Sequence, residues 1–87
     1  MTIIKIAKHV LAQEVAGETV LLDLQGEKYF GLDAVGTRIW QLLNDGRSET
    51  EIIDTLLVEY DVERKVLQQD VRELLERLSA AQLIEIC

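Results

Sequence analysis

The first third of the chain carries the mixture of apolar and polar residues that is typical of β-strands. We expect strands at about residues 9–15, 19–24 and 28–32. The loop between the second and the third of these strands has two possible lengths. A two-residue loop would place Leu22 opposite Tyr29, whereas a three-residue loop, residues 25–27, places Leu22 opposite Phe30. Burial favours the three-residue loop, because five apolar side chains then share one face: Val20, Leu22, Leu24, Phe30 and Leu32.

From residue 33 onward the apolar residues recur with the period of an α-helix. This period predicts three helices, at about residues 34–44, 49–60 and 62–80. Asp33 and Asp61 are placed to cap the first and the third helix, and Ser48 with Glu51 forms a capping box for the second. Trp40 lies on the flank of the first helix, in the core or on a partner surface. The expected core-facing residues are Val35, Ile39, Leu42 and Leu43, then Ile52, Ile53, Leu56 and Leu57, then Leu67, Val71, Leu74, Leu75 and Leu78.

Together these elements predict one α+β domain over residues 1–87. A three-stranded antiparallel sheet followed by three helices gives a winged helix-turn-helix-like arrangement, with the helices on one face of the sheet. The apolar residues Ile3, Ile4 and Ile6 open the chain. Residues 83–86 are either a short closing strand or an apolar tail.

Composition indicates that the chain folds by packing alone. Apolar residues make up 48% of the 87 residues, which excludes intrinsic disorder. No stretch approaches the roughly 20 apolar residues of a membrane span. The single cysteine, Cys87, cannot form an internal disulfide. We therefore expect a cytoplasmic protein in a reducing compartment, without a membrane partner.

The charge balance argues against nucleic acid as a partner. There are 16 acidic and 9 basic residues, a net charge of -7. Duplex DNA is bound largely through Lys and Arg at its phosphates. The third predicted helix is locally neutral, and the second carries four acidic residues and no basic one. A DNA-binding winged helix is therefore the weaker alternative.

The sequence contains no recognisable catalytic constellation. His9 is the only histidine and lies in a predicted strand, and no serine or cysteine has the context of a nucleophile paired with a base. Gly26, Gly31 and Gly36 do not form a phosphate loop, and no Cys/His set has metal-ligand spacing. We expect no enzyme activity, no cofactor and no metal, which favours a binding module.

An ordered set of short segments between residues 10 and 84 resembles the PqqD family. The segments are Val20-Leu21-Leu22-Asp23-Leu24, Tyr29-Phe30-Gly31-Leu32-Asp33, Gly36, Ile39-Trp40, Leu42-Leu43, Asp45-Gly46-Arg47, Tyr60-Asp61 and Asp70-Val71. The resemblance implies a winged-helix-like domain that recognises the leader of a ribosomally made, post-translationally modified peptide. It also implies that the leader adds as a strand beside the third strand, against the third helix, without cofactor or catalysis.

Within the family, the segment at residues 29–33 and the free-standing length resemble the discrete leader-binding proteins of lasso peptide clusters. For those systems the resemblance implies a separate leader peptidase, a cysteine protease on another chain, to which the precursor is brought. A separate cyclase then closes the ring. The alternative is a peptide chaperone of pyrroloquinoline quinone biosynthesis. That relative usually has a Pro-Glu turn where this chain has Gln25-Gly26-Glu27-Lys28.

The residues support such a site in outline. The strand at residues 28–32 ends a meander, so it is an edge unless the N-terminal strand or the tail covers it, and an edge offers unpaired N–H and C=O groups. Val66 and Leu74 would form the floor of a pocket; Asp70, Glu73 and Arg77 would contact polar groups at its rim. Alternatively, Leu74 is plain core and the charged residues are a solvated helix face. The predicted leader-binding residues are Lys28, Tyr29, Phe30, Gly31, Val66, Gln69, Asp70, Glu73, Leu74 and Arg77.

Overall fold

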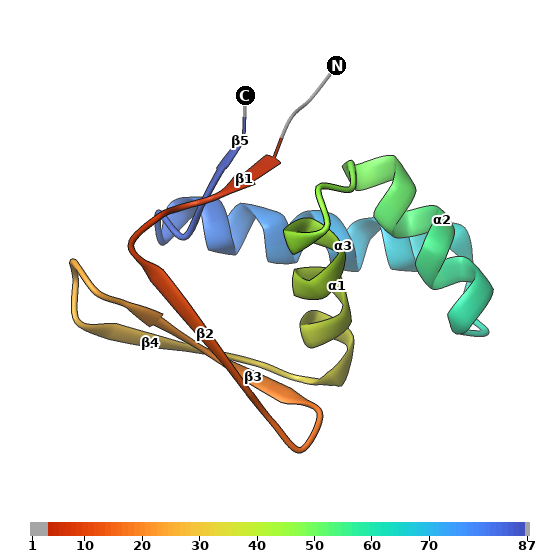
Figure 1. Cartoon of the computed structure of the whole chain (residues 1–87). Helices are drawn as coiled ribbons and strands as arrows, with labels where there is room; N and C mark the ends of the chain where they lie inside the picture. Colours follow the sequence, from red (N-terminus) through yellow and green to blue (C-terminus); the bar gives the residue numbers. More distant parts are fainter. Residues whose placement is uncertain (1–3, 87) are drawn as a thin grey trace.

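Two small antiparallel sheets and three helices make up the computed structural model, which describes residues 4–86 (Figure 1). In chain order they are β1 (Ile4–Ile6), β2 (Val10–Val15), β3 (Glu18–Asp23), β4 (Lys28–Leu32), α1 (Ala34–Asn44), α2 (Glu49–Glu59), α3 (Arg64–Ala80) and β5 (Ile84–Ile86). Ile3 and Cys87, discussed above, lie outside the described residues. The α+β fold is confirmed: a three-stranded antiparallel sheet, β2-β3-β4, precedes three helices.

The hairpin between β2 and β3 turns over Ala16 and Gly17. Both have positive φ, 54° and 82°. Positive φ at both central residues is the signature of a type I′ turn, whose twist matches that of the flanking strands. The turn pairs Val15 with Glu18 and thereby sets the register along the whole of β2 and β3.

The hairpin between β3 and β4 shows that the register predicted from the sequence is wrong. Leu22 lies opposite Tyr29, and the loop is longer than expected. The core-facing side of β3 carries Leu21, which is fully buried. Val20 and Leu24, expected on that side, are 43% and 53% exposed. Leu22 is half-buried and also lies on the outer side.

Asp23 explains this register. Its Oδ1 accepts hydrogen bonds from the backbone N–H groups of Gln25 and Gly26, both at 3.0 Å, and the Gly26 bond is the main cause of a lowered Asp23 pKa. A carboxylate that closes a turn in this way fixes the loop independently of the apolar side chains. Side-chain parity along the strands takes no account of such bonds. Phe30 and Leu32 do face the core, as expected.

The first two helices begin at the predicted caps. Asp33 Oδ1 accepts a hydrogen bond from the Gly36 N–H at 2.8 Å. Ser48 Oγ accepts from the Glu51 N–H at 3.2 Å, and the Glu51 carboxylate accepts from the Ser48 N–H at 3.0 Å, which completes the capping box. These bonds satisfy N–H groups that have no partner inside the helix.

The third helix begins later than the sequence suggested. Its first residue is Arg64, and its N-cap is Glu63, whose side chain makes no capping hydrogen bond. The prediction that Asp61 caps this helix is therefore wrong. The β-branched Val62 is 45% exposed, so packing gives little reason for it to join the helix. A guanidinium nitrogen of Arg64 instead lies 2.8 Å from Asp54 Oδ1, and this ion pair links the start of α3 to α2.

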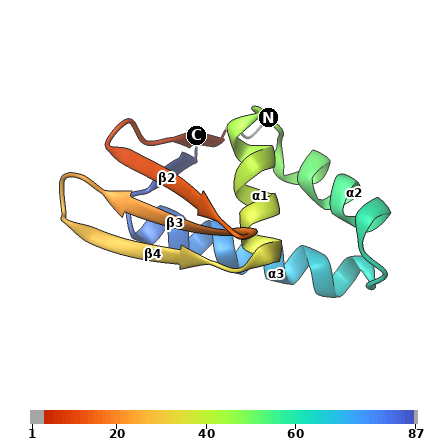
Figure 2. The same cartoon turned by 60° about the horizontal axis from the view of Figure 1, so that its bottom comes forward.

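The core lies between the three-stranded sheet and the helices. Figure 2 shows β4 running alongside the C-terminal half of α3. Trp40 is 7% exposed and belongs to the core, so it forms no partner surface. No described helix has the length and apolarity to cross a membrane. The most deeply buried side chains are Leu21, Ile39, Ile52, Leu56, Val71 and Leu78.

The two ends of the chain form the second sheet. β1 pairs antiparallel with β5, with Ile4 opposite Ile86 and Lys5 opposite Glu85 (Figure 1). Of the two alternatives for residues 83–86, the closing strand is therefore correct over Ile84–Ile86. Because β1 and β5 pair with each other, neither extends the three-stranded sheet.

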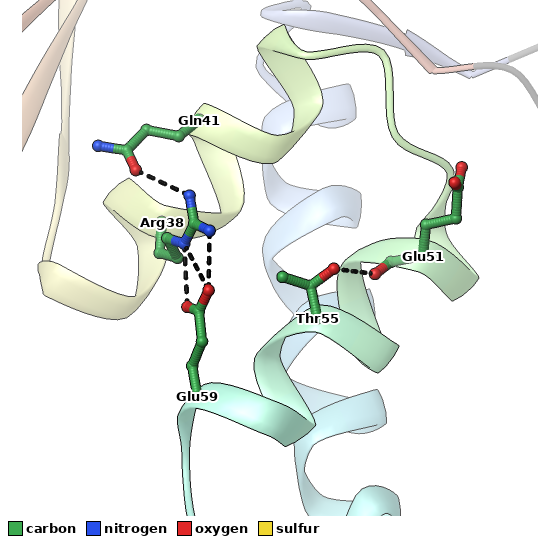
Figure 3. A network of polar contacts seen from close by, with 5 residues as sticks. All are labelled: Arg38, Gln41, Glu51, Thr55 and Glu59. Atoms are coloured by element: carbon green, nitrogen blue, oxygen red, sulfur yellow. Dashed lines mark hydrogen bonds and ion pairs between the residues drawn. The ribbon is translucent and has the colours of Figure 1, made fainter.

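A polar network joins α1 to α2 (Figure 3). Arg38 donates to Glu59 from Nε, at 2.9 and 3.1 Å, and from a terminal guanidinium nitrogen at 2.7 Å. Arg38 also donates to Gln41 at 3.3 Å, and the Thr55 hydroxyl donates to the Glu51 carbonyl at 2.8 Å. The hydrogen bonds from Arg38 lower the pKa of Glu59, and the same bonds raise the pKa of Arg38.

This network predicts a stability that depends on acid pH. Because the folded state lowers the pKa of Glu59, its contribution is complete above the ordinary glutamate pKa and is lost as the pH falls from about 5 toward 3. We expect the melting temperature of the parent to fall more steeply over this range than that of Glu59→Gln, measured by circular dichroism. Glu76→Gln, on an exposed position of α3, should retain the parent's slope. Identical slopes for the parent and Glu59→Gln would contradict the assignment.

Candidate functional site

The strand β4 has one free edge within the part of the chain that the structure describes. It is the last strand in the order β2-β3-β4 and pairs only with β3. The condition on which the predicted edge depended is therefore met: neither β1 nor β5 covers it. A free edge presents backbone donors and acceptors that a further strand can satisfy.

The turn at the far end of the sheet determines which groups point outward from β4. In a two-residue hairpin the closing pair, here Val15 and Glu18, exchanges hydrogen bonds, and the bonding direction then alternates along the strand. Carried across β3 in the observed register, this alternation directs the N–H and C=O groups of Tyr29 and Gly31 away from the sheet. The groups directed toward β3 are those of Lys28, Phe30 and Leu32.

A groove of about 410 Å³ separates the second half of β4 from α3. It contains six of the predicted site residues: Phe30, Gly31, Asp70, Glu73, Leu74 and Arg77. It also contains five residues that the sequence did not assign to a site: Leu32, Asp33, Val35, Gly36 and Ile39. Of the two residues expected at its floor, Leu74 lines the groove and Val66 does not; the three charged residues expected at its rim, Asp70, Glu73 and Arg77, also line it. Leu74 is half-buried, so it belongs both to the core surface and to the groove.

A second hollow, of about 450 Å³, continues along the first half of β4 to its turn. Lys28 and Tyr29 line it together with the end of α3 at Ala80. Phe30 borders both hollows, so the groove follows the whole strand. The guanidinium carbon of Arg77 lies 5.1 Å from the centre of the Phe30 ring, a cation–π contact between the two hollows.

Two predicted site residues lie outside the groove. Val66 is 50% exposed on α3, one turn before Asp70, and lines neither hollow. Gln69 is also exposed, and its amide donates to Glu73 at 3.4 Å. Helical spacing places both on the flank of α3 that carries Asp70 and Leu74. β4 ends at Leu32, which lies in the groove with Asp70 and Leu74.

The outer face of the sheet carries an exposed apolar surface. Leu11, Leu22 and Tyr29 lie side by side across β2, β3 and β4. Leu11 is 57% and Tyr29 is 76% exposed. Val20 and Val15, on the same face, are 43% and 60% exposed. We call these five residues the outer-face patch; exposed apolar patches are typical of protein interaction sites.

Among the described residues, His9 and the acidic side chains are the candidates for holding a metal ion or pairing with one another. Across residues 4–86, no group of three His, Cys, Asp or Glu side chains is arranged to hold a metal ion. His9 Nε2 lies 3.7 Å from Asp23 Oδ1, and Asp23 already accepts two backbone hydrogen bonds. The geometry favours binding of an extended chain.

Comparison with known proteins places the fold in a family context. A family model described as coenzyme PQQ synthesis protein D (PqqD) matches residues 18–84. No curated protein matches the chain. The solved structure of TbiB1 in complex with the TbiA(beta) leader peptide is 44% identical; the alignment covers 93% of this chain and 94% of that one, with a TM-score of 0.90.

A second solved structure, lasso peptide synthetase B1 complexed with the leader peptide, is 26% identical. The alignment covers 94% of this chain and 96% of that one, with a TM-score of 0.86. The family model spans well over half of the sequence. It includes β3, β4 and all of α1, α2 and α3. The chain therefore belongs to the PqqD family.

Proposed function

We propose that this chain binds the leader of a precursor peptide by adding it as a strand to β4, and presents it to a separate leader peptidase in lasso peptide biosynthesis. The observation that carries the proposal is the free edge of β4 beside an open groove against α3. The two similar solved structures, both complexes with leader peptides, support it. One of them is a lasso peptide synthetase component, which favours this role over pyrroloquinoline quinone biosynthesis.

The free edge of β4 and the groove against α3 have different roles in binding the leader. The outward N–H and C=O groups of Tyr29 and Gly31 bond the leader's main chain, which gives affinity for an extended peptide of almost any sequence. Alternate leader side chains then point toward α3. Those side chains enter the groove, where Phe30, Ile39 and Leu74 offer an apolar floor. Contacts in the groove determine which leader sequences bind.

Presentation to a protease requires a second surface. The outer-face patch lies on the side of the sheet away from α3, so a leader at the edge of β4 leaves its residues on β2 and β3 uncovered. We assign this patch to the leader peptidase, a cysteine protease carried on another chain. This chain holds the precursor beside the protease, and the protease supplies the nucleophile.

The proposal is tested by titrating a labelled leader peptide, with the TbiA(beta) leader as the probe. We expect saturable binding that changes little with salt, and intact peptide by mass spectrometry. Duplex DNA is the control ligand. A protein that neutralises six or more phosphates loses about a thousandfold in affinity between 50 and 200 mM salt. Tight DNA binding with such a slope, or cleavage of the leader by the purified chain, would refute the proposal.

A further inference from the structure

The polar lining of the groove between β4 and α3 has an excess of negative charge. Asp33, Asp70 and Glu73 contribute three carboxylates, and Arg77 is the only basic side chain that lines it. Arg77 stacks on the Phe30 ring, so its charge lies over the floor of the groove. Asp33 is engaged at the N-terminus of α1. Asp70 and Glu73 remain on the α3 wall.

The other arginines are engaged away from this wall. Each pairs with an acidic residue of α2: Arg38 at 2.7 Å, Arg47 at 3.5 Å, Arg64 at 2.8 Å and Arg72 at 3.3 Å. Among the described residues, Asp70 makes no ion pair and Glu73 accepts only the weak bond from the Gln69 amide. Two carboxylates without a cationic partner therefore face the space beside β4.

The spacing of α3 matches that of an added strand. Leu74 and Asp70 are one helical turn apart, about 6 Å along the axis. Side chains two residues apart in a strand lie on the same side, about 7 Å apart. Because Leu74 and Asp70 both line the groove beside β4, a leader strand that places an apolar side chain against Leu74 would bring its next inward side chain near Asp70.

We infer that the groove selects a leader carrying a lysine or arginine two residues from an apolar anchor, on the same side of the strand. This inference rests on the proposed function and specifies its peptide. The basic head contacts the carboxylates of Asp70 and Glu73, and its aliphatic stem packs beside Leu74. Asp70 and Glu73 are then specificity-determining residues, because the main-chain bonds to β4 accept any sequence.

The test is a selection of random linear peptides from a displayed library against the full chain. Parent protein should enrich peptides in which a lysine or arginine lies two positions from a large apolar residue. Asp70→Asn and Glu73→Gln should each reduce this preference. Glu76→Gln removes the same charge from an exposed position of α3 outside the groove, and should leave it unchanged. Circular dichroism establishes that each variant is folded.

A direct measurement needs no protein variant. In a peptide selected on the parent, replacing the basic residue by methionine should weaken binding about two- to fivefold, the strength of an exposed ion pair. The same replacement should have no effect on binding to the Asp70→Asn/Glu73→Gln protein. Equal binding of both peptides to the parent would overturn the inference.

Tyr29→Pro separates failure of this inference from failure of the proposed function. Selected peptides that require the β4 edge but show no basic preference overturn the charge selection and leave strand addition standing. Peptides that bind Tyr29→Pro as well as they bind the parent overturn strand addition. They also overturn the selection for a basic residue, because it rests on strand addition. Peptides that require both the edge and the basic residue support the two proposals together.

Discussion

Tyr29→Pro should weaken leader binding about 10- to 100-fold while the chain still folds. The Tyr29 N–H points away from β3, so its loss costs the sheet no hydrogen bond, and proline is tolerated at such edge positions. In the complex a carbonyl of the leader would lose the N–H that donates to it, and the proline ring would occupy the space of that carbonyl. Leader titrations by fluorescence anisotropy measure the loss, and circular dichroism melts establish the fold.

Two variants serve as controls for this result. Tyr29→Val keeps the N–H and removes the exposed ring, so the difference in leader affinity between Tyr29→Val and Tyr29→Pro measures the contribution of the backbone group. Lys28→Pro removes an N–H that points toward β3, so it should lower the melting temperature. If both proline variants stay folded and bind like the parent, strand addition at β4 is wrong.

Leu21→Ala should cost about 2–5 kcal/mol of the free energy of unfolding. Leu21 is fully buried between the sheet and the helices, so truncation leaves a cavity that the surroundings fill only in part. For a domain of this size such a loss is a large fraction of the total stability. Urea denaturation followed by circular dichroism gives the difference directly.

Leu22→Ala is the matched control, since it makes the same chemical change one residue along β3. Leu22 lies on the outer face and is only half-buried, so the change should cost clearly less than at Leu21. A larger cost at Leu22 would instead support the register that side-chain parity predicts. The pair of variants therefore tests which face of β3 is buried.

The helices were predictable because their signals are local. A helical period, a capping aspartate at Asp33 and a capping box at Ser48 each act within a few residues. The strands depended on more distant partners. The register of β3 and β4 depends on the turn that Asp23 closes, and β1 becomes a strand only because the opposite end of the chain pairs with it. Neither cause is visible in a pattern of apolar residues.

The lining of the groove was predictable where one helix face and one strand define it. Asp70, Leu74 and Arg77 follow helical spacing and lie in the groove. Val35 and Ile39 also line it, but the sequence marks them only as an apolar stripe of α1. Periodicity shows that a residue faces inward, and it does not show which other element shares the gap. The direction of the β4 backbone groups likewise followed only from the positive φ values in the distant turn.

The two walls of the groove come from segments far apart in the chain, residues 28–32 and 70–77, with α1 and α2 between them. An unfolded chain therefore has no such groove, and a ligand of the groove binds the folded state alone. By mass action, that ligand raises the free energy of unfolding by about 2.7 kcal/mol when present at a hundredfold excess over its dissociation constant. A bound precursor peptide would thus protect this chain against heat and proteolysis, and the chain would be least stable when no precursor is present.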